Sequence, residues 1–228
     1  MPGRSIPADG TRARVPAACA LLCALIGLNG CDGESEGPTR RPATRTHSRV
    51  SVAALNQALA AVRDGEASAV PDAHTIRGVP ARRQVDENTC VLACVEMLFG
   101  YWDLDRGNQL HLARAYARAN PTSPGRKAIA ALSDDQLGTA NWDGLETNYN
   151  GLINYLNKTL GDKGKCYYWS YAGEGGPERH LLALKTLLSR DVPVLASIKG
   201  PGAEVGHSVL VTGFGPRHVI LIDPITGR

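Results

Sequence analysis

The spacing of apolar residues changes once along this chain, and that change limits the fold more than any other feature. Up to about residue 190, apolar side chains recur at helical spacing in the segments 50–64, 89–101, 143–160 and 177–189. After it, β-rich runs at 192–199, 207–213 and 218–223 are separated by turns rich in Gly and Pro. Helices followed by strands predict an α+β domain. The polar stretch 120–139 is expected to connect two of the helices.

The composition is that of a globular protein rather than a disordered or membrane-spanning one. Hydrophobic residues make up 43% of the 228 residues and charged residues 21%, which is enough for a domain to bury a core without disulfides. The formal net charge is only +3 and no basic stripe with interleaved aromatic residues is present, so we expect no nucleic-acid partner. We also expect no cofactor and no metal, because the sequence has no Gly-rich phosphate loop or zinc motif.

The first thirty residues have the layout of an export signal. Three arginines precede an uncharged run at 15–30, which is short for a membrane-spanning helix. The run ends in the sequence LNGC at 28–31, which resembles the lipobox of bacterial lipoproteins, although Asn29 is unusual at its position. This resemblance implies acylation of Cys31 and a lipid anchor that holds the protein at a membrane of the cell envelope. The alternatives are an ordinary signal peptide cut near Gly30 and an uncleaved anchor.

The rest of the chain divides into three parts. Residues 31–49 are polar and rich in Pro, Gly and Arg, as expected of a flexible tether. Residues 50–75 hold an Ala-rich helix and a linker, and this helix either packs on the main domain or stays apart from it. Residues 76–228 are expected to form the functional domain, which we expect to be monomeric.

The number of cysteines indicates that at least one thiol is free. If residues 1–30 are removed and Cys31 is acylated, Cys90, Cys94 and Cys166 are left. An odd number of cysteines in an oxidising compartment predicts a free thiol. Cys94 lies inside the apolar stripe of its helix and is interpreted as a core residue. Cys166 either pairs with Cys94 or is a buried thiol.

Cys90 is the strongest candidate for a reactive thiol. It lies in the first turn of the predicted helix 89–101, next to Asn88 and Thr89, which are both good helix caps. Backbone N–H groups and the helix dipole favour a thiolate there, and the thiolate is the form that attacks a carbonyl carbon. The alternative is a small buried side chain on an apolar helix.

A histidine and an aspartate are expected to meet across the last hairpin. A hairpin centred on Gly215 pairs residue 209 with residue 221, and His207 with Asp223. The two side chains then start from Cβ atoms about 4.5–5.5 Å apart. A carboxylate in that position can fix the tautomer of the imidazole and stabilise the imidazolium. A surface ion pair at the open end of the hairpin is the alternative.

Three motifs resemble those of a known enzyme family. Gln84 stands six residues before Cys90, as in the papain-like cysteine peptidases of the bacteriocin-processing, double-glycine-leader type. Thr89 directly precedes the candidate nucleophile, and in this it resembles the Thr before the nucleophile in the related type-III-effector cysteine peptidases. The sequences GHSVLVTG at 206–213 and IDP at 222–224 resemble the family's His-containing strand and its Asp-Pro pair. The resemblance extends over residues 79–225.

The resemblance implies a papain-like fold, in which the helix that carries the nucleophile packs on a C-terminal antiparallel sheet. It implies that Cys90 is the nucleophile, His207 the general base, and Asp223 the residue that orients His207. Gln84 would donate its side-chain amide to the oxyanion. The implied reaction is cleavage of a peptide or protein substrate through a thioester. Acyl transfer on the same fold and a catalytically silent peptide-binding lipoprotein are the alternatives.

The sequence departs from the family at several points. Val91 stands where the family usually has Gly, and we expect it to narrow the substrate groove. Five residues follow Asp223, whereas relatives generally continue with more sheet, so we expect a minimal domain or a truncated sequence. No transporter module follows, so the leader-peptide substrate of the bacteriocin-processing enzymes is not expected here.

Overall fold

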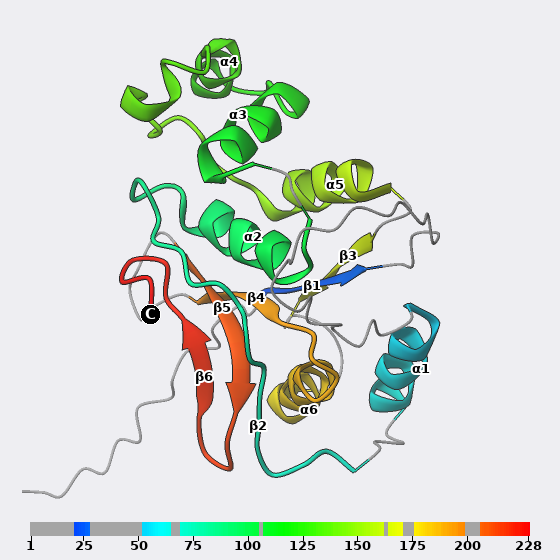
Figure 1. Ribbon diagram of the computed structural model, residues 1–228. Helices are drawn as coiled ribbons and strands as arrows, with labels where there is room; N and C mark the ends of the chain where they lie inside the picture. Colours follow the sequence, from blue (N-terminus) through cyan, green and yellow to red (C-terminus); the bar gives the residue numbers. More distant parts are fainter. Residues whose placement is uncertain are drawn as a thin grey trace, which may run out of the picture.

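A mixed sheet-and-helix fold is seen in the computed structural model, which describes residues 21–27, 52–64, 69–104, 107–161, 164–170, 176–198 and 206–228. A six-stranded antiparallel sheet forms its centre (Figure 1). The strand order is β2-β5-β4-β1-β3, and β6 also pairs with β5. The strands are β1 (Leu21–Gly27), β2 (His74–Thr75), β3 (Gly164–Ser170), β4 (Val194–Ile198), β5 (His207–Phe214) and β6 (Val219–Ile222).

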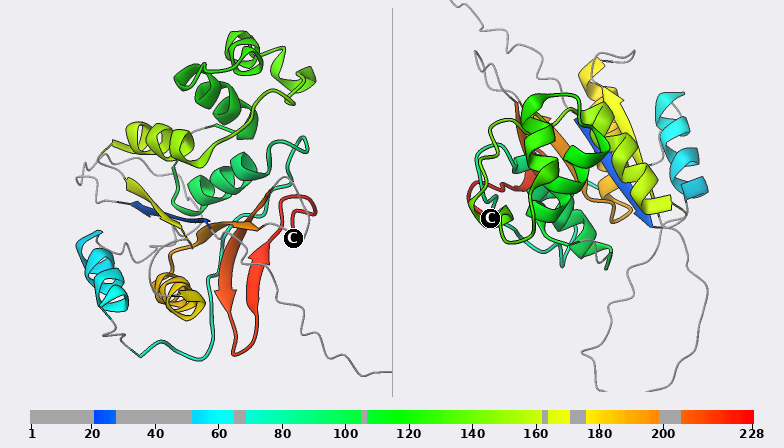
Figure 2. Two further views of the ribbon diagram at one scale, coloured as in Figure 1. Left: turned by 180° about the vertical axis from the view of Figure 1, so that it is seen from behind. Right: turned by 90° about the horizontal axis from the view of Figure 1, so that it is seen from above.

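Helices cover both faces of this sheet. Helices α2 (Cys90–Tyr101) and α5 (Tyr149–Leu160) lie on one face, and α6 (Gly176–Leu188) lies on the other, with α1 (Val52–Arg63) packed against it (Figures 1 and 2). Helices α3 (Gln109–Ala119) and α4 (Pro124–Ala131) form an outer layer beyond α2, and a short 3-10 helix follows at Leu137–Thr139. The contact between α1 and α6 shows that the Ala-rich helix is attached to the main domain.

Strand β5 separates two hydrophobic cores, because successive side chains of a strand point to opposite faces. Leu210 packs among residues of α2 and α5, whereas Val209 and Val211 pack among residues of α6. Burial of each such side chain stabilises the fold by about 1.5–3 kcal/mol. The helix that begins at Cys90 is thereby fixed against the strand that begins at His207.

The predicted α+β class agrees with this architecture, but the sheet is not restricted to the C-terminal part of the chain. Strands β4, β5 and β6 are the three that the sequence predicted. Strand β3 was not predicted, because its sequence GKCYYWS at 164–170 shows no regular alternation of apolar and polar residues. Strand β2 is only two residues long, which is too short for a periodic signal.

The helix predictions were correct for α1, α2 and α6 to within about two residues at either end. Helix α5 begins at Tyr149 rather than 143, because the side chain of Asn148 caps it by accepting a hydrogen bond from the N–H of Gly151 at 2.7 Å. The polar stretch 120–139, expected to be a connection, contains α4. Ser123 caps that helix and Pro124 is its first residue, which is a start signal that the sequence did carry.

Residues 21–27 lie within the predicted export signal, yet they form strand β1. This strand pairs with β3 from Leu21–Ser170 to Gly27–Gly164, and with β4 at Cys23 and Ala24. Cleavage before Cys31 would remove β1 from between its two neighbours. Cys31 and the tether at 31–49 lie outside the described residues. Among the described helices, none has both the length and the apolar character needed to cross a membrane.

The short strand β2 is held at the end of β5 by close backbone contact and by a side-chain hydrogen bond. A Cβ atom at Gly213 would lie 2.6 Å from the carbonyl oxygen of His74, so a side chain there would push β2 away. His74 Nε2 lies 2.9 Å from Oδ1 of Asp191, which follows α6. Among the described residues, this is a second hydrogen-bonded His–Asp pair, besides the one predicted at His207.

Candidate active site

Cys90 is the first residue of α2, and the end of the helix around it has no side-chain cap. Thr89 precedes it, but its hydroxyl donates to the carbonyl oxygen of Asp86 at 2.8 Å rather than capping the helix. The N–H groups of Leu92 and Ala93 both donate to the Thr89 carbonyl. Among the described contacts, the N–H groups of Cys90 and Val91 have no acceptor. Two free donors and the positive end of the helix dipole favour an anion at this partly exposed thiol.

His207 and Asp223 are in direct contact, as the sequence predicted. His207 Nε2 lies 2.8 Å from Asp223 Oδ1, and the two side chains are 26% and 33% exposed. Because Nε2 of His207 is hydrogen-bonded to Asp223, the ring nitrogen of His207 that is left to interact with a thiol is Nδ1. Between the described side chains of Cys90 and His207 the structure shows no hydrogen bond.

The predicted register of the hairpin is wrong by two residues. Val211 pairs with Leu221 and Leu210 with Ile222, because an irregularity lies between Val211 and Gly213 and the turn occupies 215–218. A shift of two residues leaves each side chain on its expected face of the strand. His207 and Asp223 therefore meet as diagonal rather than direct neighbours.

The carboxylate of Asp223 is held in its charged form. Partial burial raises its pKa, but hydrogen bonds from the N–H of Ile225 and from the His207 ring outweigh this effect and bring the pKa below its ordinary value. A charged Asp223 next to His207 is the arrangement that stabilises an imidazolium.

This depressed pKa predicts a loss of stability in acid. Folding favours the charged carboxylate, so the contribution of Asp223 is fully present above its unfolded-state pKa of about 4 and is lost as the pH falls through the lower folded-state value. The difference in the free energy of unfolding between wild type and Asp223→Asn should be at most about 1 kcal/mol near pH 5 and should shrink below pH 4. Urea unfolding at a series of pH values measures it. A difference that persists unchanged to pH 2.5 would contradict the lowered pKa.

The side-chain amide of Gln84, the predicted oxyanion donor, is hydrogen-bonded within its own loop. Its side-chain amide donates to the carbonyl oxygen of Asp86 at 2.9 Å, and its Oε1 is buried without a hydrogen-bond partner. Its backbone is firmly placed, since its N–H donates to the carbonyl oxygen of Pro224 at 2.8 Å. That bond ties the segment before α2 to the turn that carries Asp223.

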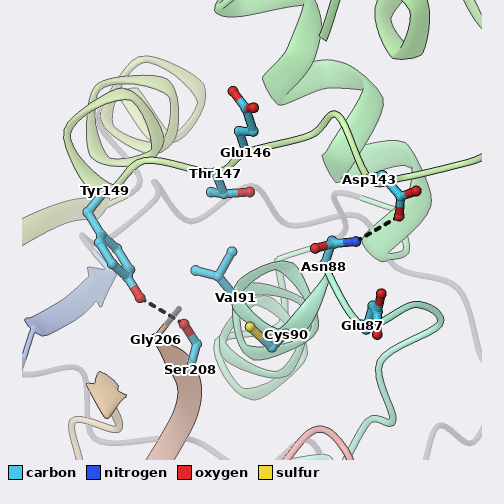
Figure 3. Close-up of a pocket in the computed structure, with 10 residues that line it drawn as sticks. All are labelled: Glu87, Asn88, Cys90, Val91, Asp143, Glu146, Thr147, Tyr149, Gly206 and Ser208. Atoms are coloured by element: carbon cyan, nitrogen blue, oxygen red, sulfur yellow. Dashed lines mark hydrogen bonds between the residues drawn. The ribbon is translucent and has the colours of Figure 1, made fainter. Parts of the chain in front are cut away.

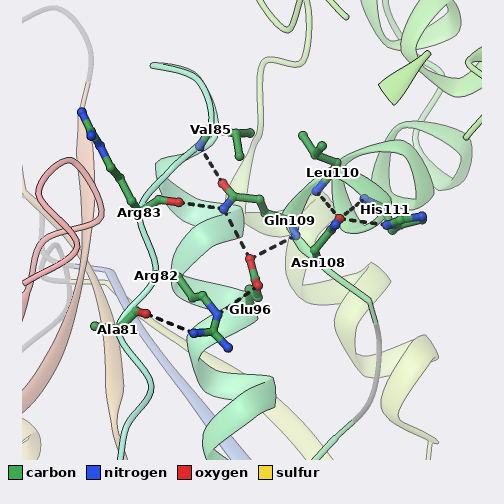
Figure 4. A network of polar contacts seen from close by, with 9 residues as sticks. All are labelled: Ala81, Arg82, Arg83, Val85, Glu96, Asn108, Gln109, Leu110 and His111. Carbon is green, nitrogen blue, oxygen red and sulfur yellow. Dashed lines mark hydrogen bonds and ion pairs between the residues drawn. The ribbon is translucent and has the colours of Figure 1, made fainter. Parts of the chain in front are cut away.

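Gln109 holds the same segment from its other side (Figure 4). Its buried side chain donates to the carbonyl oxygen of Arg83 at 2.8 Å and accepts from the N–H of Val85 at 3.0 Å. These two backbone groups flank Gln84. The side-chain amide of Gln109 thus makes the same pair of hydrogen bonds, one donated and one accepted, that the backbone of a neighbouring strand would make. Gln109 could not be identified from the sequence, since a glutamine at the start of a helix carries no signal of burial.

A cavity of about 370 Å³ opens beside Cys90 (Figure 3). Gly206 and Ser208, the two chain neighbours of His207, line it together with Cys90, so the candidate nucleophile and the candidate base belong to the same region. Val91 forms part of the wall, but it does not close the space. The complete lining comprises Glu87, Asn88, Cys90, Val91, Asp143, Glu146, Thr147, Tyr149, Gly206 and Ser208.

The other two cysteines of the domain are buried. Cys94 lies one turn after Cys90, and its thiol donates to the carbonyl oxygen of Ser208 at 3.6 Å. Burial, and then the nearby Cys90 and Asp223, raise the pKa of Cys94 well above its ordinary value. Cys166 is also buried, and the structure shows no disulfide between the two. The thiol that remains accessible is Cys90.

Comparison with known protein families gives one result. The model of the Peptidase_C39 like family matches residues 76–228, which include every candidate residue of the site. Searches of curated proteins and of solved structures found no match.

Proposed function

Because the chain belongs to the Peptidase_C39 like family, which relates it to the papain-like cysteine peptidases, we propose that it hydrolyses peptide bonds through a thioester on Cys90. One observation carries the proposal. Cys90, at the uncapped start of α2, lines the same cavity as the two chain neighbours of His207, and His207 is hydrogen-bonded to Asp223. A nucleophile, a base and an orienting carboxylate are the parts that this chemistry requires.

The reaction would proceed in two steps. His207 takes the thiol proton, and the thiolate of Cys90 attacks the carbonyl carbon of the scissile peptide bond. When the C–N bond breaks, the imidazolium gives its proton to the leaving amine, and an acyl group remains on Cys90. A water molecule then attacks the thioester while His207 accepts its proton. The carboxylic acid leaves and the thiol is restored.

The oxyanion of each step would be held by N–H donors. The N–H of Cys90 is free at the helix start, and removal of one such donor typically lowers kcat about 10²–10³-fold. Gln84 would be a second donor, because its amide nitrogen carries two hydrogens and the carbonyl oxygen of Asp86 takes only one of them. The buried Oε1 of Gln84 has no hydrogen-bond partner, so rotation of this side chain towards the oxyanion would break no bond of that oxygen.

We also propose that the protein is exported and acylated on Cys31. The support comes from the sequence alone, namely the basic and then apolar layout of residues 1–30 and the LNGC sequence at 28–31. The strand β1 formed by residues 21–27 favours the alternative, in which the signal is not cleaved and these residues stay in the sheet.

Thiol labelling followed by mass spectrometry tests the proposed nucleophile. Under native conditions near neutral pH, an alkylating peptide-like reagent should modify Cys90 at least about 100-fold faster than Cys94 or Cys166. The reason is that Cys94 and Cys166 are buried and the pKa of Cys94 is raised. Equal labelling of the three thiols would contradict the assignment. The same spectra show whether the mature chain begins at Cys31 or retains residues 21–27.

A further inference from the structure

The cavity beside Cys90 carries negative charge only. Glu87, Asp143 and Glu146 contribute carboxylates, and none of the other lining residues is a lysine, arginine or histidine. All three acidic residues are exposed. None of them takes part in the ion pairs found between described residues. Unpaired charges of one sign around a cavity produce a negative potential that attracts cations.

Two chain segments carry these carboxylates, and a side-chain hydrogen bond connects the segments. Glu87 lies in the turn before α2, whereas Asp143 and Glu146 lie before α5. The amide of Asn88 donates to Oδ1 of Asp143 at 3.2 Å, and both residues line the cavity (Figure 3). The relative placement of the two segments is therefore fixed next to the thiol.

A buried guanidinium fixes the segment that carries Glu146. Arg126 is 4% exposed and donates to the carbonyl oxygen of Leu145 at 2.8 Å and to that of Glu146. Glu146 has a φ of 42°, a left-handed conformation that costs free energy for a residue with a Cβ. The surrounding fold therefore imposes the backbone position of this acidic residue.

The inner wall of the cavity is uncharged. Val91 and Tyr149 line it, and the hydroxyl of Tyr149 is hydrogen-bonded to Ser208 Oγ at 2.9 Å. Thr147 Oγ1 is buried without a hydrogen-bond partner. A volume of about 370 Å³ has room for a long side chain. Lysine and arginine suit such a space, because their methylene groups can lie on the inner wall while their charge stays at the acidic mouth.

On the premise of the proposed peptidase function, we propose that this cavity selects substrates with a lysine or arginine side chain next to the scissile bond. An organic cation suits the site better than a metal ion. Among the described residues, no group of three or more His, Cys, Asp or Glu side chains is placed to hold a metal.

Charged thiol reagents test the cavity without requiring turnover. Aminoethyl and sulfonatoethyl methanethiosulfonate carry opposite charges and transfer their groups to a thiol by the same reaction. For each reagent, the rate constant with Cys90 is divided by its rate constant with the free thiol 2-mercaptoethanol. At low salt, we expect this relative rate to be at least about 10-fold higher for the cationic reagent than for the anionic one. The preference should decrease strongly in about 0.5 M NaCl. Equal relative rates at low salt, or no modification of Cys90 by either reagent, would overturn the proposal.

Two triple variants locate the effect. Glu87→Gln with Asp143→Asn and Glu146→Gln should remove most of the charge preference. The matched control changes three exposed acidic residues that do not line the cavity, Asp72→Asn, Asp135→Asn and Glu178→Gln. This control has the same net charge as the first variant, so it should keep the preference. Loss of the preference in both variants would assign it to net charge and not to the cavity.

Peptide substrates separate this inference from the proposed function. Three peptides that differ only in Lys, norleucine or Glu beside the scissile bond should be cleaved in that order, with kcat/KM for Lys at least about 10-fold above that for norleucine. If no peptide is cleaved while Cys90 keeps its preference for the cationic reagent, the peptidase function fails and the cation site stands. If all three are cleaved equally well, the function stands and the specificity fails.

Discussion

Replacement of Cys90 by alanine is expected to lower kcat for peptide hydrolysis by about 10⁴-fold or more, which is the usual loss when a covalent nucleophile is removed. The change removes the partly exposed thiol at the start of α2 and leaves the helix intact, because alanine is a good helix former. Turnover of the Lys-containing reporter peptide measures it, and circular dichroism checks that the variant is folded.

Cys94 provides a matched control on the same helix, one turn further along. Cys94→Ala removes a buried thiol and its contact with the Ser208 carbonyl. It should lower the stability by about 1 kcal/mol, with kcat within a few-fold of wild type. If Cys94→Ala abolished turnover and Cys90→Ala did not, the roles of the two cysteines would have to be exchanged.

His207→Ala is the second change with a large expected effect, a fall in kcat of about 10³–10⁵-fold. Without the imidazole, the thiol loses the group that takes its proton, and the leaving amine loses its proton donor. The side chain is partly exposed at the start of β5, so its removal should change the stability little.

The second hydrogen-bonded His–Asp pair described in the fold makes the test specific. His74 and Asp191 lie 2.9 Å apart, with His74 27% exposed, which is close to the 2.8 Å and 26% found for His207. His74 does not line the cavity. His74→Ala should therefore have an effect on stability similar to that of His207→Ala and leave kcat unchanged. A comparable loss of turnover in both variants would indicate a general effect on folding.

The sequence was sufficient to predict the His207–Asp223 contact, even though the predicted register was wrong. Side chains in a strand alternate with a period of two, so an error of two residues keeps both on their expected faces. The position of Cys90 at a helix start could also be predicted, because Asn88 and Thr89 are both good helix caps and stand at the start of the apolar run. These features depend on local patterns.

Features built from distant segments could not be predicted in this way. Gln109 bonds to the backbone on both sides of Gln84, 25 residues earlier, and nothing in the residues around Gln109 indicates that contact. The buried Arg126 is a similar case, since two of its acceptors are carbonyl oxygens of a later loop. A sequence shows which groups are polar, but it does not show which backbone groups they will reach.

The separation of the site along the chain has a consequence for biosynthesis. Cys90 is translated 117 residues before His207, and Gln84 is fixed in part by the carbonyl oxygen of Pro224. On the ribosome, the thiol is therefore present long before its base and before the hairpin that completes the site. A growing chain would remain unable to cut itself or its neighbours until that hairpin docks against α2. The long loop that must close for this to happen favours slow folding, so the proposed proteolytic activity should appear only late in the folding of the protein.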